Sequence, residues 1–228
     1  MCNIAFDNAV LILDNLKHIE FELSIDEPFP FRIAKESHLT FYRAMIEALR
    51  GTANLQVTYD RSVKRRHTHK YKLGNSQWCE IRKAKLESCK YVWRFTEPTP
   101  CDPPDKLVSL NWDDIKKKKF LINFYEALAM VQSECFMCHF FLSKPLIVSD
   151  EAMKDLEYLH VLVRNEFEHF IPQTWSFDKA KLFQISRLCL RLTKEIFTET
   201  KSIMAHRAVP GIPNKIDVLS TKIAKIGV

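Results

Sequence analysis

Over most of this 228-residue chain, apolar residues recur three and four positions apart, and this spacing constrains the fold more than any other feature. Residues spaced in this way share one face of an α-helix, so each segment must bury an apolar stripe against a neighbour. The chain has only four glycines, and therefore few of the tight turns that many short strands require. The pattern predicts a mainly α protein, built as a four- to five-helix bundle.

Five helical segments follow from this spacing. Their expected ranges are about 3–21, 34–50, 112–140, 149–170 and 178–206. Residues suited to helix N-caps stand at the starts of the last three, namely Asn111, Ser149 and Asp178. Pro172 ends the fourth helix, because proline cannot continue it. We therefore expect one helical domain at 1–206 and a flexible C-terminal tail at 207–228.

Between the second and third of these helices the apolar period changes to two. Val57 and Tyr59 alternate with polar residues, and Gly74-Asn75-Ser76 has the composition of a hairpin turn. The sequence predicts a small antiparallel, β-rich insert at 55–95, followed by a linker at 96–110 that is rich in turn-forming residues.

The positive charge of the chain is concentrated in this insert. Residues 61–94 contain eleven lysines and arginines against Glu80 and Glu87, an excess of nine positive charges. The whole chain has a net charge of +6, so the remaining residues together carry −3. Such a charge asymmetry favours a polyanionic partner for the insert.

Basic and aromatic side chains alternate within the insert. This composition suits single-stranded RNA, since cations contact phosphates while rings stack on bases. The residues expected to contact RNA are Arg61, Lys64, Arg65, Arg66, Lys70 and Lys72. Two alternatives stay open: a solvated charged hairpin whose rings pack on the helices, and a surface that docks an acidic protein such as an antitoxin.

The most specific local motif is Arg164-Asn165-Glu166-Phe167-Glu168-His169, near the end of the fourth expected helix. RNA carries its own nucleophile, the 2′-hydroxyl, so its cleavage requires proton transfer and stabilisation of charge on the phosphate. Histidine suits proton transfer, because its reference pKa is about 6.5. Arginine suits the phosphate, because its planar guanidinium donates two hydrogen bonds to phosphate oxygens. We expect His169 as general acid or base, Arg164 as phosphate clamp and Asn165 as a positioning residue.

This run fits the signature Arg-(Asn/Asp/His)-x(3–5)-His, and in it the chain resembles the HEPN superfamily. The resemblance implies a small helical bundle and a metal-independent ribonuclease, often the toxin of a toxin–antitoxin pair or part of a phage-defence system. It also implies a homodimer in which motif residues of both chains form the site. The resemblance covers the helical part of the chain, and residues at about 52–104 are an addition to it.

The spacing within the motif limits how one chain can use it. Arg164 and His169 lie roughly 140° apart around a regular helix, whereas Asn165 and His169 share a face. A site shared between two chains, or an irregular helix end, would bring the arginine and histidine together. A structural reading remains open, in which Arg164 forms surface ion pairs with Glu168 and Glu157. So does a non-catalytic binding or regulatory protein that works through the basic insert.

Two groups of cysteine and histidine residues resemble a haem-attachment site and a zinc site, but neither makes a convincing match. Cys135-Phe136-Met137-Cys138-His139 matches the haem-attachment pattern, but it stands in an apolar helical segment, where small buried thiols are the simpler explanation. His67, His69, Cys79 and Cys89 have spacings that match no common zinc site. We therefore expect neither a cofactor nor a bound metal ion.

Cellular location follows from what the sequence lacks. No apolar run approaches the roughly 20 residues of a membrane span. No basic region precedes an apolar stretch at the N-terminus, and the seven cysteines do not suggest a disulfide framework. The sequence predicts a cytoplasmic protein without membrane contact.

Overall fold

The structure of the chain is a computed structural model. The residues that it describes are 8–50, 57–60, 119–132, 137, 142–161, 177–203 and 209–226. Within these residues the protein is mainly helical, as the sequence predicted. No helix in the described ranges is both long enough and apolar enough to cross a membrane.

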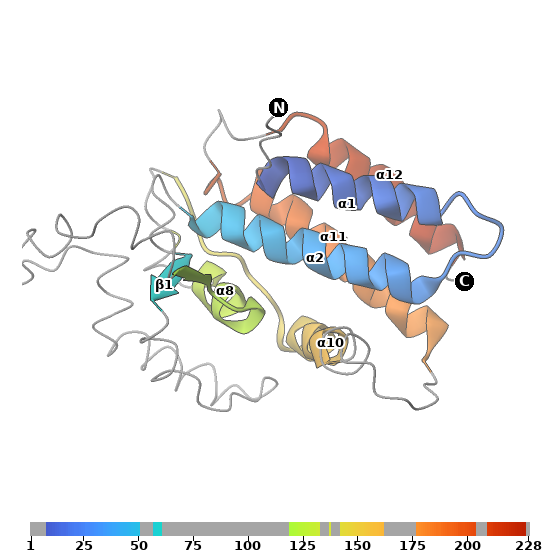
Figure 1. Cartoon of the computed structure of the whole chain (residues 1–228), viewed down its shortest axis with the longest axis horizontal. Coiled ribbons are helices and arrows are strands. Elements are labelled where there is room, and N and C mark those ends of the chain that lie inside the picture. The colour runs from blue at the N-terminus through green and yellow to red at the C-terminus, as the bar shows by residue number, and fades with distance from the viewer. Residues whose placement is uncertain are drawn as a thin grey trace, which may run out of the picture.

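Four helices lie side by side and form the largest part of the described structure (Figure 1). They are α1 (Asn8–Glu22), α2 (Pro30–Leu49), α11 (Lys179–Thr198) and α12 (Ile212–Ile226). Helix α2 packs against α1 and α11, and α12 packs against α11 and α1, so the four enclose a common core. Each helix buries an apolar stripe in this core.

The hairpin of α1 and α2 is closed by a buried carboxylate. Glu22 is 5% exposed, and its side chain accepts a hydrogen bond of 2.8 Å from the backbone N–H of Phe29. The sequence predicted that α2 would start near residue 34, after two prolines, but it begins at Pro30. Proline is tolerated in the first turn of a helix, where its missing N–H has no intrahelical partner in any case.

A short sheet replaces part of the long helix expected at 112–140. Strand β1 (Thr58–Asp60) pairs antiparallel with β2 (Lys119–Leu121), with Tyr59 opposite Phe120. The continuous helix is therefore wrong over these residues. Residues 55, 56 and 61–95 of the expected insert, which include its hairpin turn, and the linker at 96–110 lie outside the described residues.

Helix α8 (Phe124–Val131) begins directly after this sheet, and its start is fixed by a capping box. The Asn123 side chain accepts a hydrogen bond of 2.9 Å from the Glu126 backbone N–H, and the Glu126 carboxylate accepts one of 2.8 Å from the Asn123 N–H. Two backbone donors are satisfied by this exchange. Asn123 thus begins a helix, whereas Asn111, the expected cap, lies outside the described residues.

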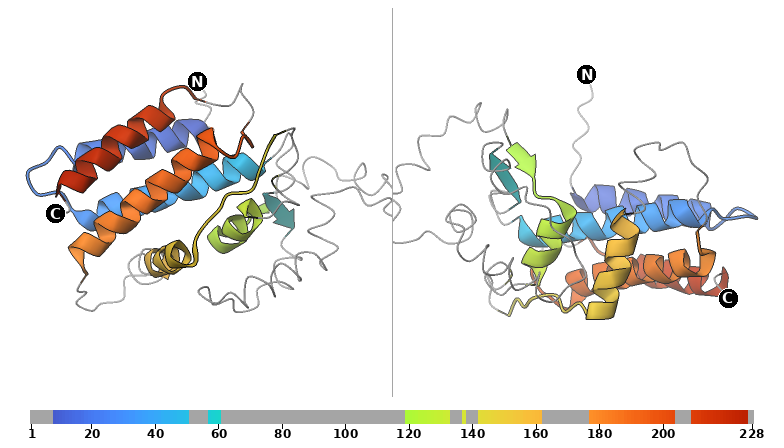
Figure 2. Two further views of the ribbon diagram at one scale, coloured as in Figure 1. Left: turned by 180° about the vertical axis from the view of Figure 1, so that it is seen from behind. Right: turned by 90° about the horizontal axis from the view of Figure 1, so that it is seen from below.

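The N-caps predicted for the next two helices are confirmed. Ser149 caps α10 (Asp150–His160), and the Asp178 side chain accepts hydrogen bonds from two backbone N–H groups at the start of α11. Helices α8 and α10 lie beside the four long helices, on the side of α2 and α11 (Figure 2).

The C-terminal segment is not the flexible tail that the sequence suggested, because residues 212–226 form α12. This helix buries an isoleucine and leucine stripe consisting of Ile212, Ile216, Leu219 and Ile223. Gly211 precedes it with a φ of +99°, a conformation that glycine adopts at little cost. The prolines around this glycine therefore mark the start of a helix.

Candidate functional site

The residues predicted to carry function lie outside the described residues. The description stops at Val161, three positions before Arg164, and resumes at Phe177, so Asn165 and His169 are not included either. The same holds for the predicted RNA contacts, which are Arg61, Lys64, Arg65, Arg66, Lys70 and Lys72. The described element closest to the motif in sequence is α10, and the contacts of α10 are therefore the informative ones.

The first half of α10 is held against α11 by polar contacts. The Ser149 hydroxyl accepts a hydrogen bond of 3.3 Å from the Ala152 N–H at the start of the helix. One turn later, the carboxylate of Asp155 accepts hydrogen bonds from Lys181 Nζ at 2.6 Å and from Gln184 Nε2 at 3.5 Å. Asp155 is 7% exposed, so this charge is compensated where it is buried.

The C-terminal end of α10 is held against α2 by a pair of histidines. His38 Nε2 and His160 Nδ1 are 3.1 Å apart, within hydrogen-bond distance, although the two residues are 122 positions apart in the chain. His38 is 5% exposed and His160 is 4% exposed, so the pair is removed from water.

An aromatic cluster from α8 and α2 surrounds this pair. The Phe124 ring stacks on both imidazoles, with ring centroids 4.4 Å from His38 and 4.8 Å from His160. Tyr125 lies 4.4 Å from the His160 ring, and Tyr42 lies 6.0 Å from the Phe124 ring. Three helices that are distant in sequence therefore meet at these rings.

The chemistry of the pair follows from the number of protons that it can hold. A hydrogen bond between two imidazole nitrogens needs one N–H and one free lone pair. The pair can therefore be neutral or can carry one extra proton, but protonation of both rings would place two N–H groups and two charges face to face. The contact between the two rings therefore depends on how many protons they hold.

Sequence reasoning missed both histidines. Each occupies a position on the buried face of its helix, His38 beside Phe41 and His160 beside Leu159 and Leu156. A histidine in an apolar stripe is a usable signal that a buried polar contact exists. The identity of the partner is not available from spacing, because the two positions belong to different helices.

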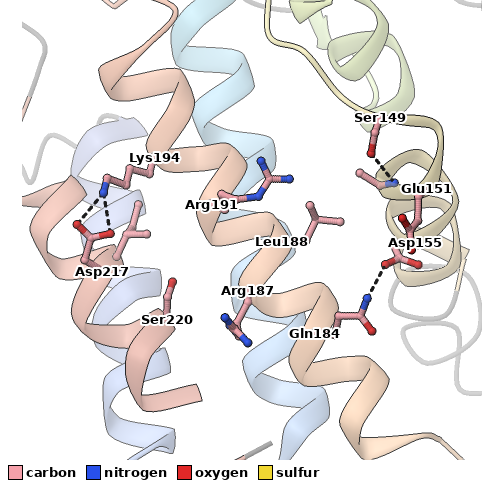
Figure 3. Close-up of a pocket in the computed structure, with 12 residues that line it drawn as sticks. Ser149, Glu151, Asp155, Gln184, Arg187, Leu188, Arg191, Lys194, Asp217 and Ser220 are labelled. Atoms are coloured by element: carbon pink, nitrogen blue, oxygen red, sulfur yellow. Dashed lines mark hydrogen bonds and ion pairs between the residues drawn. The ribbon is translucent and has the colours of Figure 1, made fainter. Parts of the chain in front are cut away.

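A groove of about 550 Å³ runs between α10, α11 and α12 (Figure 3). Side chains from all three helices face it, and the charged ones are Glu151, Asp155, Arg187, Arg191, Lys194 and Asp217. The three basic side chains come from successive turns of α11, since Arg187, Arg191 and Lys194 are four and three positions apart.

Most charges of this groove are already paired within the protein. Lys194 Nζ donates to both carboxylate oxygens of Asp217, at 2.7 and 2.8 Å, and Arg191 is paired with Glu195. Asp155 is paired with Lys181 as described above. Three cations and three carboxylates line the groove, so its charge does not favour a polyanion such as RNA.

A second polar cluster connects α1 and α2. The Arg43 guanidinium donates a hydrogen bond of 2.9 Å to the backbone carbonyl of Leu11 and another to the Asn15 side chain. Glu36 lies 3.8 Å from the His18 imidazole. Burial raises the pKa of Glu36 above its ordinary value, and the nearby positive charge of His18 opposes this effect.

The described ranges also bear on metal-ion binding. In these ranges no three histidine, cysteine, aspartate or glutamate side chains converge as a set that could hold a metal ion. The haem-like run 135–139 is described only at Met137, and the residues considered for zinc lie outside the described residues.

Comparisons with known protein families, with curated proteins and with solved structures found no match.

Proposed function

We propose that this protein is a metal-independent endoribonuclease of the toxin or defence type, with its catalytic site on the Arg164–His169 segment. The observation that carries the proposal is the motif itself, in which a histidine, an arginine and an asparagine suited to phosphate chemistry stand together in six residues. The mainly helical fold agrees with the architecture that the HEPN resemblance implies. The described helix that precedes the motif, α10, ends four residues before Arg164 and is held against α11 and α2 by polar contacts.

The reaction is an internal transfer at phosphorus. The 2′-hydroxyl oxygen attacks the adjacent phosphorus, and the bond from phosphorus to the 5′-oxygen of the next nucleotide breaks. His169 accepts the proton of the 2′-hydroxyl or supplies a proton to the departing 5′-oxygen. Arg164 binds the phosphate oxygens as charge builds on them, and Asn165 orients the phosphate. The products are a 2′,3′-cyclic phosphate and a 5′-hydroxyl.

Two features complete the proposed enzyme. The basic β-rich insert holds the RNA backbone through Arg61, Lys64, Arg65, Arg66, Lys70 and Lys72. A homodimer of the helical bundle brings Arg164 of one chain toward His169 of the other, because these positions diverge by roughly 140° on one regular helix. An acidic antitoxin is the corresponding protein partner for the insert.

The test is cleavage of labelled RNA by the purified protein in excess EDTA. We expect the wild-type protein to cleave. His169→Ala should lose at least about a hundredfold in rate, the usual contribution of a general acid–base group. Arg164→Ala should lose about a hundredfold as well, because it removes the donor that stabilises charge on the phosphate. His18→Ala is the matched control, since His18 is a surface histidine of α1. Equal rates for wild type and His169→Ala on several RNAs would refute the assignment.

A rival function is separated by charge reversal in the insert. If the protein only binds nucleic acid or an acidic partner, Arg65→Glu with Arg66→Glu abolishes binding while His169→Ala changes nothing. For the ribonuclease, the same reversal raises KM, and His169→Ala lowers kcat.

A further inference from the structure

We propose that the His38–His160 contact is a proton-sensitive clamp that positions the C-terminal end of α10. Its existence follows from the described residues alone, and only its effect on RNA cleavage rests on the proposed function. His38 and His160 are thus positioning residues, which act on the reaction through α10, the described helix that precedes the motif.

The clamp follows from the surroundings of the pair. Both imidazoles are at least 95% buried, and Phe124 covers them with its ring, so their mutual hydrogen bond is what satisfies the two facing nitrogens. Loss of that bond would leave polar nitrogens in an apolar site. The contact therefore stabilises the arrangement in which α10 meets α2 and α8.

Protonation sets the direction of the effect. In the closed pair, the two facing nitrogens share at most one proton. When the imidazoles separate and are exposed to water, each of these two nitrogens binds its own proton below the reference histidine pKa of about 6.5. The open state therefore binds more protons, and acidification favours opening. The titratable groups that the described elements bring to the pair are Tyr125 of α8, in ring contact with His160, and Tyr42 of α2, one turn after His38.

The connection to catalysis is the covalent chain. Arg164 follows His160 by only four positions. Because so few residues separate them, a displacement of His160 would also displace Arg164. A misplacement of about 1 Å in a catalytic group can cost about a hundredfold in rate. The clamp thereby makes the geometry of the motif depend on pH.

The direct test is amide hydrogen exchange of the full chain between pH 5 and 8, expressed as protection factors that correct for the intrinsic exchange rate. We expect protection of residues 156–160 in α10 to fall by up to about tenfold per pH unit below pH 6.5, because opening takes up one further proton. Protection in the middle of α12 is the internal control and should not change in this way. An unchanged protection of α10 across this range would overturn the clamp.

Two variants separate the clamp from general packing. His38→Phe with His160→Phe keeps two buried rings and removes the proton, so α10 should remain protected and its pH dependence should disappear. His38→Phe alone leaves His160 without this partner, and α10 should exchange faster than in the double variant. His18→Phe, at the surface of α1, should retain the wild-type pH dependence. If both single and double variants keep the wild-type profile, the pair is not the clamp.

Cleavage assays then distinguish the two proposals. If RNA is cleaved, kcat of the double Phe variant should fall less steeply below pH 6.5 than kcat of the wild type, with little change in KM, because only the part of the fall that comes from His169 as general acid or base remains. If the wild type cleaves no RNA but α10 opens with acid, the proposed function fails and the clamp stands. If RNA is cleaved at His169 but neither exchange nor kcat responds to the double substitution, the clamp fails and the function stands.

Discussion

At the scale of single residues, the buried polar side chains show the limit of what sequence spacing predicts. Each of them needs a polar partner, and the spacing of residues does not identify that partner. Asp155, His38 and His160 occupy positions on buried helix faces, yet each has a polar contact with another helix. An apolar period predicts which face is buried, but it does not predict which buried polar groups meet. The histidine pair was therefore beyond the reach of sequence reasoning.

Glu36 gives a prediction at this scale, since burial raises its pKa above the ordinary value of 4.5. The folded protein holds this proton more tightly than the unfolded chain, so its contribution to stability is present below pH 4.5 and is lost as pH rises through the raised pKa. Glu36→Gln should abolish that fall in the free energy of unfolding, measured by urea denaturation from pH 4 to 7. Glu27→Gln, an exposed site, should retain it. An equal fall in wild type and Glu36→Gln would contradict the assignment.

At the scale of elements, local chemistry decided where helices begin. Ser149 and Asp178 were correctly predicted as caps because their side chains act on N–H groups two or three residues away. The strand at Lys119–Leu121 was missed because its partner, Thr58–Asp60, is remote in sequence. Its residues were assigned to the long helix expected at 112–140, because Phe120 and Leu121 continue the apolar residues of α8.

The capping box of α8 provides the element-scale prediction. Asn123→Ala removes the acceptor for the Glu126 N–H and should lower the free energy of unfolding by about 1 kcal/mol. Asn123→Ser keeps an acceptor at the same place and should restore most of the loss. Urea denaturation of the three proteins measures both effects. Identical midpoints for Ala, Ser and wild type would show that this helix start is not fixed by the side chain.

At the scale of the whole molecule, the mainly helical fold was predicted from periodicity, and the packing of its last segment was not. Helix α12 closes the group of four helices by contacting both α11 and α1. Its sequence was read as a tail because of Pro210, Gly211 and Pro213, although proline suits a first turn. The isoleucine and leucine stripe that follows these residues indicates a helix, and it is a better predictor here than the prolines.

Two neighbouring residues of α12 test this packing. Leu219 is fully buried, whereas Val218 is 52% exposed. Leu219→Ala should lower the free energy of unfolding by about 2–5 kcal/mol, and Val218→Ala by no more than about 0.5 kcal/mol. Both are measured by urea denaturation. Similar effects of the two substitutions would mean that α12 does not belong to the core.

The functional assignment concerns residues that the described structure leaves out, so its evidence is the chemistry of the motif and the helical context that precedes it. The groove between α10, α11 and α12 does not replace that site, because its charges are mostly paired within the protein. We propose that RNA is contacted by the basic insert and cleaved at the Arg164–His169 segment.

The most direct test of the proposed function compares an RNA with the DNA of the same sequence, which lacks the 2′-hydroxyl. Purified wild-type protein is incubated in EDTA with an RNA and with the DNA of the same sequence, and the ends of the products are identified. We expect that the RNA is cleaved to 2′,3′-cyclic phosphate and 5′-hydroxyl ends, that the DNA stays intact, and that His169→Ala cleaves neither. Cleavage of both substrates, or RNA cleavage that persists in His169→Ala, would contradict the proposed function.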